Sequence, residues 1–392
     1  MDMFMNRRSF LEAGAGAVTL LGCSLIRTPE GRAAAAEAKE PAKAEKVAEV
    51  PVVWMATGSC TGCSVSLLNS AAPTIQELLL DEVLPGKHIS LAFHATVMAA
   101  QGEQAMEALK DTVKNHRGGY VFVVDGATAT ADDGLHCTVG ERSDGRPLTG
   151  FEHVRDLSRD ALAVLAVGAC SSFGGIPAAG ANPTGAISVP ELLERERIKT
   201  PVVRIPGCPP HPDWIVGTIA ALLIGGLKAL DLDDQLRPRA FFGQCIHDDC
   251  PYRGQFESGN FASHFGEHGC LLKLGCKGPI TYADCPIRKF NNGISWCVEA
   301  GHPCIGCCHP DFPFENSLFA PVTPAQLSFP EVFPPARADI VEHRQADKST
   351  YATLGMIGVA AFLAGAGVTA AARQLKAQEG EDASTPSPTE DQ

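Results

Sequence analysis

One stretch of the chain concentrates its cysteines: nine of the fifteen lie between Cys245 and Cys308, within 64 residues. Thiolates are soft ligands that bind zinc or iron-sulfur clusters in preference to calcium or magnesium. A structural zinc site usually takes two short pairs of ligands, whereas most of these ligands are scattered singly along the chain. The spacing therefore favours iron-sulfur clusters, and it separates two sets of four: His247, Cys250, Cys270 and Cys276, and then Cys285, Cys297, Cys304 and Cys307.

Composition limits what so many cysteines can do. At 392 residues, with 45% hydrophobic and 20% charged residues, the chain is long enough for two domains with apolar cores. Disulfide-dense proteins are short secreted domains that lack such a core, so we expect metal ligation to use most of these thiols. The formal net charge of -13 argues against a nucleic-acid partner, which would require a dominant basic surface.

The first residues carry an export pattern. An apolar, Gly- and Ala-rich run at 13–26 and small residues at 33–36 follow the sequence Asn6-Arg7-Arg8-Ser9-Phe10-Leu11. This pattern predicts a twin-arginine signal peptide over residues 1–36, with an ordinary basic signal as the alternative. Twin-arginine export carries folded proteins, so a cofactor can be inserted before export. Cys23 is an alternative site for lipidation.

The region 50–230 alternates short apolar runs with helical segments, which predicts a doubly wound, mainly parallel α/β fold. The expected strands are 52–54, 120–124, 162–167 and 202–205, and the expected helices begin at 64 and span 103–114, 151–160 and 190–197. Ser188 is expected to cap the last of these helices, with Pro190 in its first turn. The apolar run at 214–227 is too short to span a bilayer, so we expect a buried helix there.

Four further cysteines follow three of the expected strands. Cys60 and Cys63 follow the first strand, Cys170 follows the strand at 162–167, and Cys208 follows the strand at 202–205. Ligands of doubly wound folds bind beyond the carboxyl ends of the strands, so these four thiols are expected to converge on one crevice. This predicts a third four-ligand site, with a redox pair at Cys60 and Cys63 as the alternative.

Six short motifs recur around these cysteines: Gly58-Ser59-Cys60-Thr61-Gly62-Cys63-Ser64, Gly168-Ala169-Cys170, Asn182-Pro183-Thr184-Gly185, Pro206-Gly207-Cys208-Pro209-Pro210, Gly275-Cys276-Lys277-Gly278-Pro279 and Gly301-His302-Pro303-Cys304. In this order they resemble the small subunit of nickel-iron hydrogenases, over about residues 50–320. The resemblance implies a flavodoxin-like domain at 50–230, followed by a small, largely irregular or helical iron-sulfur domain at 231–325. In that family the small subunit holds three iron-sulfur clusters in a line, and a separate large subunit holds the nickel-iron centre.

The resemblance also implies a role for each ligand set. Carried over by position, Cys60, Cys63, Cys170 and Cys208 bind the proximal 4Fe-4S cluster, and His247, Cys250, Cys270 and Cys276 bind the distal 4Fe-4S cluster. A neutral imidazole in place of a thiolate removes negative charge from a cluster and raises its potential, which suits the site where electrons leave. The alternative for His247 is a surface histidine before two aspartates.

The chain departs from the family pattern at Cys297. Many members have a proline after the tryptophan, and their middle cluster is then 3Fe-4S. Here Cys297 follows Trp296, so a complete middle 4Fe-4S cluster is expected, as in nickel-iron-selenium relatives, on Cys285, Cys297, Cys304 and Cys307. Cys137, Cys245 and Cys308 have no ligand role in the pattern and are expected to be buried or half-buried thiols, although Cys308 could compete with Cys307.

The C-terminal part of the chain predicts a membrane anchor. Residues 351–372 carry no formal charge and are rich in Gly and Ala, which predicts a transmembrane helix after a linker at 326–350 and before a cytoplasmic tail at 373–392. Its small residues would let a neighbouring helix approach closely, which implies an integral membrane partner. The alternative is an amphipathic or buried helix.

Two functional classes follow from these patterns. The first is an electron-transferring hydrogenase subunit on the periplasmic face of the cell membrane, passing electrons from dihydrogen oxidation to a membrane acceptor or the quinone pool. Its expected partners are the large subunit, in a heterodimer or a dimer of heterodimers, and a membrane quinone-reactive, cytochrome or ferredoxin-like subunit. The second is a plain electron carrier related to the cluster-bearing subunit of respiratory complex I, which lacks the region 231–320.

Overall fold

A five-stranded parallel sheet organises the first half of the protein. The computed structural model describes residues 48–80, 87–314, 318–323 and 327. The strand order is β2-β1-β3-β6-β7, with bounds β1 (Ala48–Ala56), β2 (Lys87–His94), β3 (Val121–Asp125), β6 (Ala163–Val167) and β7 (Val202–Ile205). This is the flavodoxin-type order, in which the chain reverses direction across the sheet between β1 and β3. The predicted doubly wound α/β fold is confirmed.

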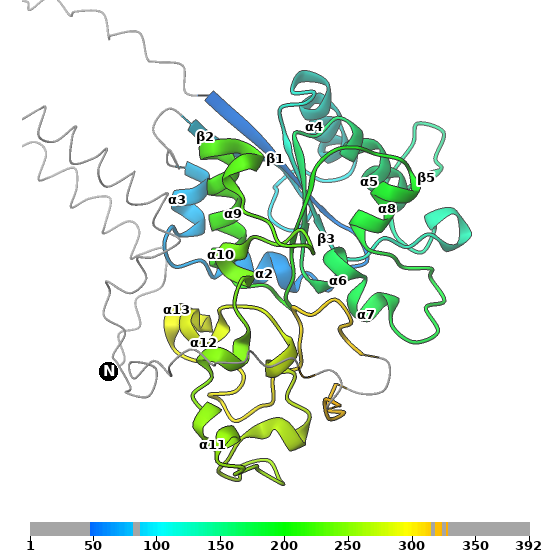
Figure 1. Ribbon diagram of the computed structural model, residues 1–392. Helices are drawn as coiled ribbons and strands as arrows, with labels where there is room; N and C mark the ends of the chain where they lie inside the picture. Colours follow the sequence, from blue (N-terminus) through cyan, green and yellow to red (C-terminus); the bar gives the residue numbers. More distant parts are fainter. Residues whose placement is uncertain (1–47, 81–86, 315–317, 324–326, 328–392) are drawn as a thin grey trace, which may run out of the picture. The chain divides into compact units, whose positions relative to one another are not determined.

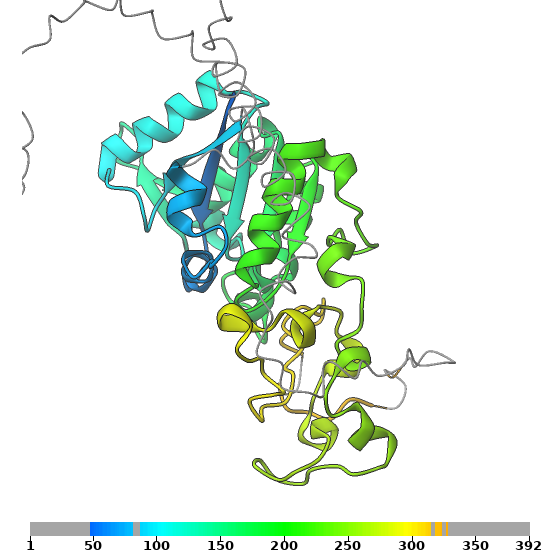
Figure 2. The ribbon, with the colours of Figure 1, turned by 90° about the vertical axis from the view of Figure 1, so that its left-hand side faces the viewer.

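Alternating side chains place apolar residues on both faces of the sheet. In β1, Val52 and Trp54 belong to one buried cluster, whereas Val53 and Met55 belong to the other. The first face is covered by α2 (Gly62–Leu68), α3 (Ile75–Leu80) and α9 (Pro212–Gly225), and the second by α4 (Gly102–Asn115), α5 (Gly150–Arg159) and α8 (Val189–Arg195). Figure 2 shows α4 and α9 on opposite sides of the strands. A strand buried on both faces reads as a continuous apolar run, which is why β3 and β6 could be predicted.

Most predicted elements agree with the structure, but β2 and a short hairpin were not predicted. The hairpin pairs β4 (Thr138–Glu141) with β5 (Pro147–Thr149). β2 is an edge strand, and Ile89 and Phe93 are its deeply buried apolar residues. Two buried apolar residues give a weak pattern in the sequence. Ser188 caps α8, as predicted, by accepting a hydrogen bond from the backbone of Glu191 at 3.3 Å.

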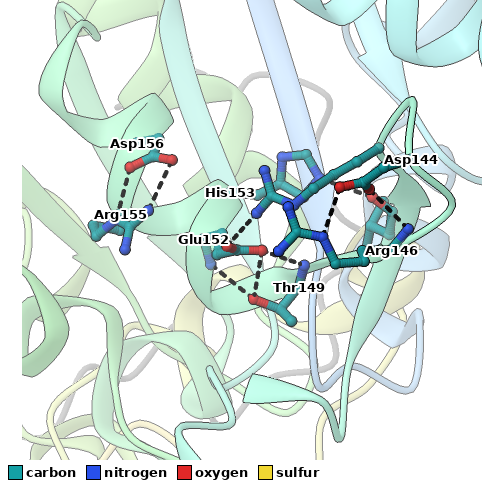
Figure 3. A network of polar contacts seen from close by, with 9 residues as sticks. Asp144, Arg146, Thr149, Glu152, His153, Arg155 and Asp156 are labelled. Carbon is teal, nitrogen blue, oxygen red and sulfur yellow. Dashed lines mark hydrogen bonds and ion pairs between the residues drawn. The ribbon is translucent and has the colours of Figure 1, made fainter. Parts of the chain in front are cut away.

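A capping box fixes the start of α5 directly after the hairpin. The Thr149 hydroxyl accepts from the Glu152 amide at 3.2 Å, and the Glu152 carboxylate accepts from the Thr149 amide at 3.1 Å (Figure 3). The hydrogen bond from the Thr149 amide, followed by the charge of Arg142, holds the pKa of Glu152 below its ordinary value. Arg142 on the hairpin also pairs with Glu152, so the hairpin and α5 are joined.

Helix α9 is apolar along most of its length. Among the residues that the structure describes, the segment 212–229 is the one helix long and apolar enough to cross a membrane by length and composition. Trp214, Ile215 and Ile219 are nevertheless buried against the sheet. This confirms the predicted buried helix. The predicted signal peptide (1–36), transmembrane helix (351–372) and tail (373–392) lie outside the described residues, as does the predicted linker (326–350) apart from Leu327.

Beyond residue 238 the described part of the chain forms only short elements. They are α10 (Arg239–Phe242), η3 (Ile246–Asp249), α11 (Arg253–Glu257), η4 (Leu271–Leu274), η5 (Gly278–Ile280), α12 (Cys285–Arg288) and α13 (Phe290–Gly293). Phe242, Ile246 and Trp296 are buried in the same cluster as Trp214 of α9. The cysteine-rich region therefore shares its apolar core with one face of the sheet, and Figure 1 shows it beyond the strand ends near α2 and α6 (Ala169–Phe173).

Candidate metal centres

Four cysteines gather at the carboxyl ends of the strands, as the sequence predicted. Cys60 follows β1, Cys63 lies in α2, Cys170 lies in α6 directly after β6, and Cys208 follows β7. The pKa of Cys63 is raised far above its ordinary value, first by burial, then by Asp125, and then by the sulfurs of Cys170 and Cys60. Partial desolvation of its sulfur raises the pKa of Cys208 to about 12, with contributions from Cys307, Cys170 and Cys60. The four sulfurs therefore lie within electrostatic reach of one another.

Asp125 is a buried carboxylate among these thiols that the sequence reasoning missed. It is the last residue of β3 and is 1% exposed. It accepts hydrogen bonds from the hydroxyls of Ser59 at 2.7 Å and Ser64 at 3.1 Å. These two serines flank Cys60 and Cys63, so Asp125 ties the cysteine-bearing turn to the neighbouring strand. A carboxylate ending an otherwise apolar strand, at the same edge as the cysteines, was the available signal.

Gly168 leaves room for a sulfur at this edge. Its backbone has a φ of 92°, a conformation that residues other than glycine rarely adopt. A Cβ at this position would stand 2.5 Å from the sulfur of Cys63. The turn between β6 and α6 therefore requires glycine for two independent reasons.

The four predicted distal ligands line one cavity. It has about 320 Å³ of empty space, part of it open to solvent, and His247, Cys250, Cys270 and Cys276 all contribute to its wall. Burial lowers the pKa of His247 to about 4, with a smaller contribution from the charge of Arg253. The imidazole is therefore neutral near pH 7, the form that binds metals. Burial also raises the pKa of Cys250 to about 12 and that of Cys276 to about 11.

The four predicted middle ligands lie close together in the same region. Cys285 begins α12, and burial, then Cys307, Asp284 and Cys297 raise its pKa well above the ordinary value. The pKa of Cys304 is also raised well above its ordinary value, first by burial and then by the charges of Cys276, Cys307 and Cys285. Asp284 accepts from the indole of Trp214 at 2.7 Å, which connects this site to α9.

Backbone contacts connect the three sets of sulfurs. The amide of Cys304 donates to the sulfur of Cys276 at 3.4 Å, which joins the middle and distal sets. The backbone of Cys208 lowers the pKa of Cys307, and the Cys307 sulfur raises that of Cys208, so the proximal and middle sets are neighbours. The Cys308 thiol is the first cause of the lowered pKa of Cys307, and burial acts in the opposite direction. The three sets therefore form one continuous series.

The three cysteines outside the sets have other surroundings. Cys308 is fully buried and donates to the carbonyl of Pro206 at 3.6 Å. Cys245 is half-buried and donates to the carbonyl of Gly278 at 3.3 Å, and Cys137 is also half-buried. Their expected state as buried or half-buried thiols is confirmed.

The donor sets fit iron-sulfur clusters better than single metal ions. Within residues 48–80 and 87–314 and the short described pieces beyond, no three His, Cys, Asp or Glu side chains are placed to hold one ion together. A zinc site needs its four ligands at bonding distance from a single point. Each ligand of a cluster binds a different iron, so cluster ligands stand apart around a space such as the one His247 lines. Because burial keeps these thiols protonated, cluster binding must release their protons.

Sequence comparisons identify relatives over most of the chain. The family described as the C-terminal part of the NiFe/NiFeSe hydrogenase small subunit matches residues 242–320, and the family described as "NADH ubiquinone oxidoreductase, 20 Kd subunit" matches residues 60–222. The periplasmic [NiFeSe] hydrogenase small subunit of Desulfomicrobium baculatum is 44% identical over 81% of this chain and 99% of that protein. The quinone-reactive Ni/Fe-hydrogenase small chain of Wolinella succinogenes is 39% identical over 81% of this chain and 86% of that protein.

A solved structure has the same fold. The [NiFeSe] hydrogenase of Desulfomicrobium baculatum has a chain that matches with a TM-score of 0.66 and 46% identity, covering 70% of this chain and 99% of that chain. A parallel α/β sheet followed by a cysteine-rich region defines an electron-transferring iron-sulfur subunit of an oxidoreductase. The chain belongs to the small subunits of nickel-iron and nickel-iron-selenium hydrogenases, which carry iron-sulfur clusters and pair with a large subunit. The match over 242–320 excludes the alternative of a plain carrier that lacks this region.

Proposed function

We propose that this small subunit passes electrons from dihydrogen oxidation through three 4Fe-4S clusters in series. The bound clusters supply one-electron carriers. The proximal cluster is held by Cys60, Cys63, Cys170 and Cys208, the middle one by Cys285, Cys297, Cys304 and Cys307, and the distal one by His247, Cys250, Cys270 and Cys276. The observation that carries this assignment is the pair of contacts, between Cys208 and Cys307 and between Cys304 and Cys276, which connects the three sets in that order.

An apolar surface beside the proximal set supports docking of the large subunit there. Val65 and Leu68 of α2 are 52% and 41% exposed, and Ile176 of α7 (Gly175–Ala178) is 55% exposed. Cys60 and Cys208 are themselves exposed at this edge. A partner that covers this surface excludes water from the proximal cluster and brings its nickel-iron centre next to the electron path. The complex is a heterodimer or a dimer of heterodimers.

At the other end of the series, His247 marks the exit. Its neutral, buried imidazole contributes no negative charge to the distal cluster, and this raises the potential of the site that electrons reach last. The quinone-reactive relative supports a membrane quinone as the final acceptor, reached through an integral quinone-reactive or cytochrome subunit. Export by the twin-arginine pathway and a helix at 351–372 place the complex on the periplasmic face of the membrane.

Metal analysis of the purified heterodimer tests the cluster assignment. Three complete cubanes predict about twelve irons for this chain, with nickel in the partner. The variant Cys297→Pro should lose one iron, raise the middle potential and create the electron paramagnetic resonance signal of a 3Fe-4S cluster. A strong 3Fe-4S signal in the oxidised, undamaged wild-type protein would contradict the role of Cys297.

Deletion of residues 349–392 tests the membrane assignment separately. The truncated complex should be released in soluble form and should still oxidise dihydrogen with an artificial dye, because every proposed ligand lies upstream. It should lose coupling to the quinone pool. The full-length protein should resist washing with salt or carbonate, as a spanning helix does. If the truncated complex stays on the membrane, the anchor lies elsewhere, and Cys23 becomes the candidate.

A further inference from the structure

Lys277 is a buried cation between two of the ligand sets. Lys277 is only 3% exposed, and it directly follows the distal ligand Cys276 in the chain. The ammonium donates to the carbonyl of Gly275 at 3.3 Å and to that of Ala320, and it stands 5.2 Å from the centre of the Phe314 ring. Among the residues that the structure describes, the charged groups that act on it are the sulfurs of Cys276 and Cys304 and not a carboxylate.

A charge in this position is costly unless an opposite charge faces it. An isolated ammonium loses several kcal/mol of hydration on burial, and carbonyl groups replace only part of it. Burial accordingly lowers the pKa of Lys277, while the nearby sulfurs of Cys276 and Cys304 act in the opposite direction. Cys276 belongs to the distal set and Cys304 to the middle set. Once they lose their protons on cluster binding, the sulfurs of these two ligands become the anionic groups beside the ammonium, and they belong to two different sites.

The surrounding backbone fixes the position of this side chain. The amide of Lys277 donates to the carbonyl of Cys304 at 2.7 Å, and the Thr281 hydroxyl donates to the carbonyl of Lys277 at 2.8 Å. Gly306 has a φ of 72°, and a Cβ there would stand 3.0 Å from both the Cβ of Lys277 and the Phe314 ring. Glycine at 306 therefore makes room for the lysine between the two middle ligands Cys304 and Cys307.

We propose that Lys277 is the counter-charge of the middle and distal clusters, a positioning residue whose fixed ammonium favours the reduced state of both. The proposal rests on the ligand sets assigned above. One electron enters a cluster in each step, no bond forms or breaks, and the ammonium keeps its proton. A nearby positive charge stabilises the added negative charge, so it raises both midpoint potentials. The proximal cluster, whose sulfurs do not face Lys277, is unaffected.

Potentiometric titration of the purified heterodimer, followed by electron paramagnetic resonance, measures this effect. Lys277→Met removes the charge and keeps the length of the side chain, and Lys277→Gln keeps donors for the carbonyls of Gly275 and Ala320. Lys277→Arg keeps the charge. Lys273→Met is the matched control, because Lys273 lies in the same region but is exposed to solvent.

In the Met and Gln variants we expect the middle and distal potentials to fall by at least about 59 mV. For a one-electron couple this corresponds to a tenfold decrease in the ratio of reduced to oxidised cluster at a fixed potential. The Arg and Lys273 variants should shift neither cluster by this amount, and the proximal potential should stay constant in all four. Unchanged middle and distal potentials in Lys277→Gln, or an equal shift in Lys273→Met, overturn the proposal. Iron analysis distinguishes a failure of the ligand assignment from a failure of the proposal for Lys277. A wild-type protein without about twelve irons contradicts the ligand assignment, independently of the Lys277 variants.

Discussion

The sheet region and the cysteine-rich region keep their structure by different means. The sheet region holds long regular elements, and its central strand β3 is fully buried on both faces. The cysteine-rich region has no described helix longer than the five residues of α11. Backbone hydrogen bonds and apolar side chains position the sheet, whereas irregular segments need other cross-links. Clusters supply such cross-links, because one cluster joins four points of the chain.

This difference separates two kinds of site on one chain. The proximal sulfurs stand on strand ends, where the sheet fixes them before any metal binds. The middle and distal sulfurs stand on short turns such as η3 and α12, each of only four residues. We infer that the sheet prepares its cluster site, while the cysteine-rich region depends on its clusters for its own order.

Removal of iron should produce the largest effect and tests the comparison directly. Without clusters, the amides of residues 245–308 should lose protection against hydrogen exchange by at least ~100-fold, or ~2.7 kcal/mol of local stability. The amides of β3 and β6 should keep theirs. Hydrogen exchange measured by mass spectrometry on iron-loaded and iron-free protein gives both values at once. Equal protection of 245–308 in the two forms would show that its apolar core suffices.

Gly168→Ala should empty the proximal site while leaving the sheet folded. The added Cβ would stand 2.5 Å from the sulfur of Cys63, so this ligand cannot keep its place. Iron analysis should show a loss of about four irons of about twelve. Gly145→Ala is the matched control, because it has a φ of 79° but nothing within 4 Å of the new Cβ. Its cost should be limited to ~1–2 kcal/mol of backbone strain, with full iron content.

Arg288→Met should weaken the junction between the two regions. The Arg288 guanidinium pairs with Asp284 at 2.8 Å and with Asp213 of α9 at 2.9 Å, and its side chain is 13% exposed. Its removal leaves two half-buried carboxylates without this partner, which should cost less than the ~3–5 kcal/mol of a fully buried pair but more than a surface pair. Thermal unfolding of the purified complex measures the loss.

The exposed pair of Arg146 and Asp144 provides the control for this junction. The Arg146 side chain is 75% exposed, so Arg146→Met should change stability by less than ~1 kcal/mol. If the Arg288 and Arg146 variants unfold at the same temperature, the half-buried pairs of Arg288 do not hold the regions together.

His153 should give a small pH effect that is confined to the sheet region. Its Nε2 donates to the carbonyl of Val139 at 2.8 Å, and burial lowers its pKa, partly offset by the charges of Glu152 and Asp156, while Arg142 lowers it further. The folded state therefore disfavours the protonated ring. Its stability contribution is complete above the ordinary pKa of about 6.5 and is lost as the pH falls toward the lower folded value.

The loss from this one group cannot exceed ~1.4 kcal/mol per pH unit. Urea unfolding at pH 7 and pH 5.5 measures it, and His153→Gln, which keeps a donor for Val139, should flatten the dependence. The same pH dependence in wild type and variant would assign the effect to another group.

The sequence predicted those helices and strands that are recognisable from a few consecutive residues. The strand at β7 and the Ser188 cap were predicted because an apolar run and a capping residue suffice for each. The edge strand β2 was missed because it buries too few of its side chains for a clear pattern. Asp125 was missed although its place at the end of an apolar strand was a signal. The role of Lys277 could not be predicted, since a buried charge is recognised through neighbours such as Cys304, which lies 27 residues further along the chain.

The two contacts that connect the ligand sets also have a consequence for the order of synthesis. Cys304 and Cys307 are the last proposed ligands that the ribosome produces, yet they contact Cys276 and Cys208 from the two other sets. Chains fold from the N-terminus as they are made, so β7 and the turn at Cys208 form before their contact exists. The ligand set of the middle cluster is therefore the last of the three to be completed during synthesis.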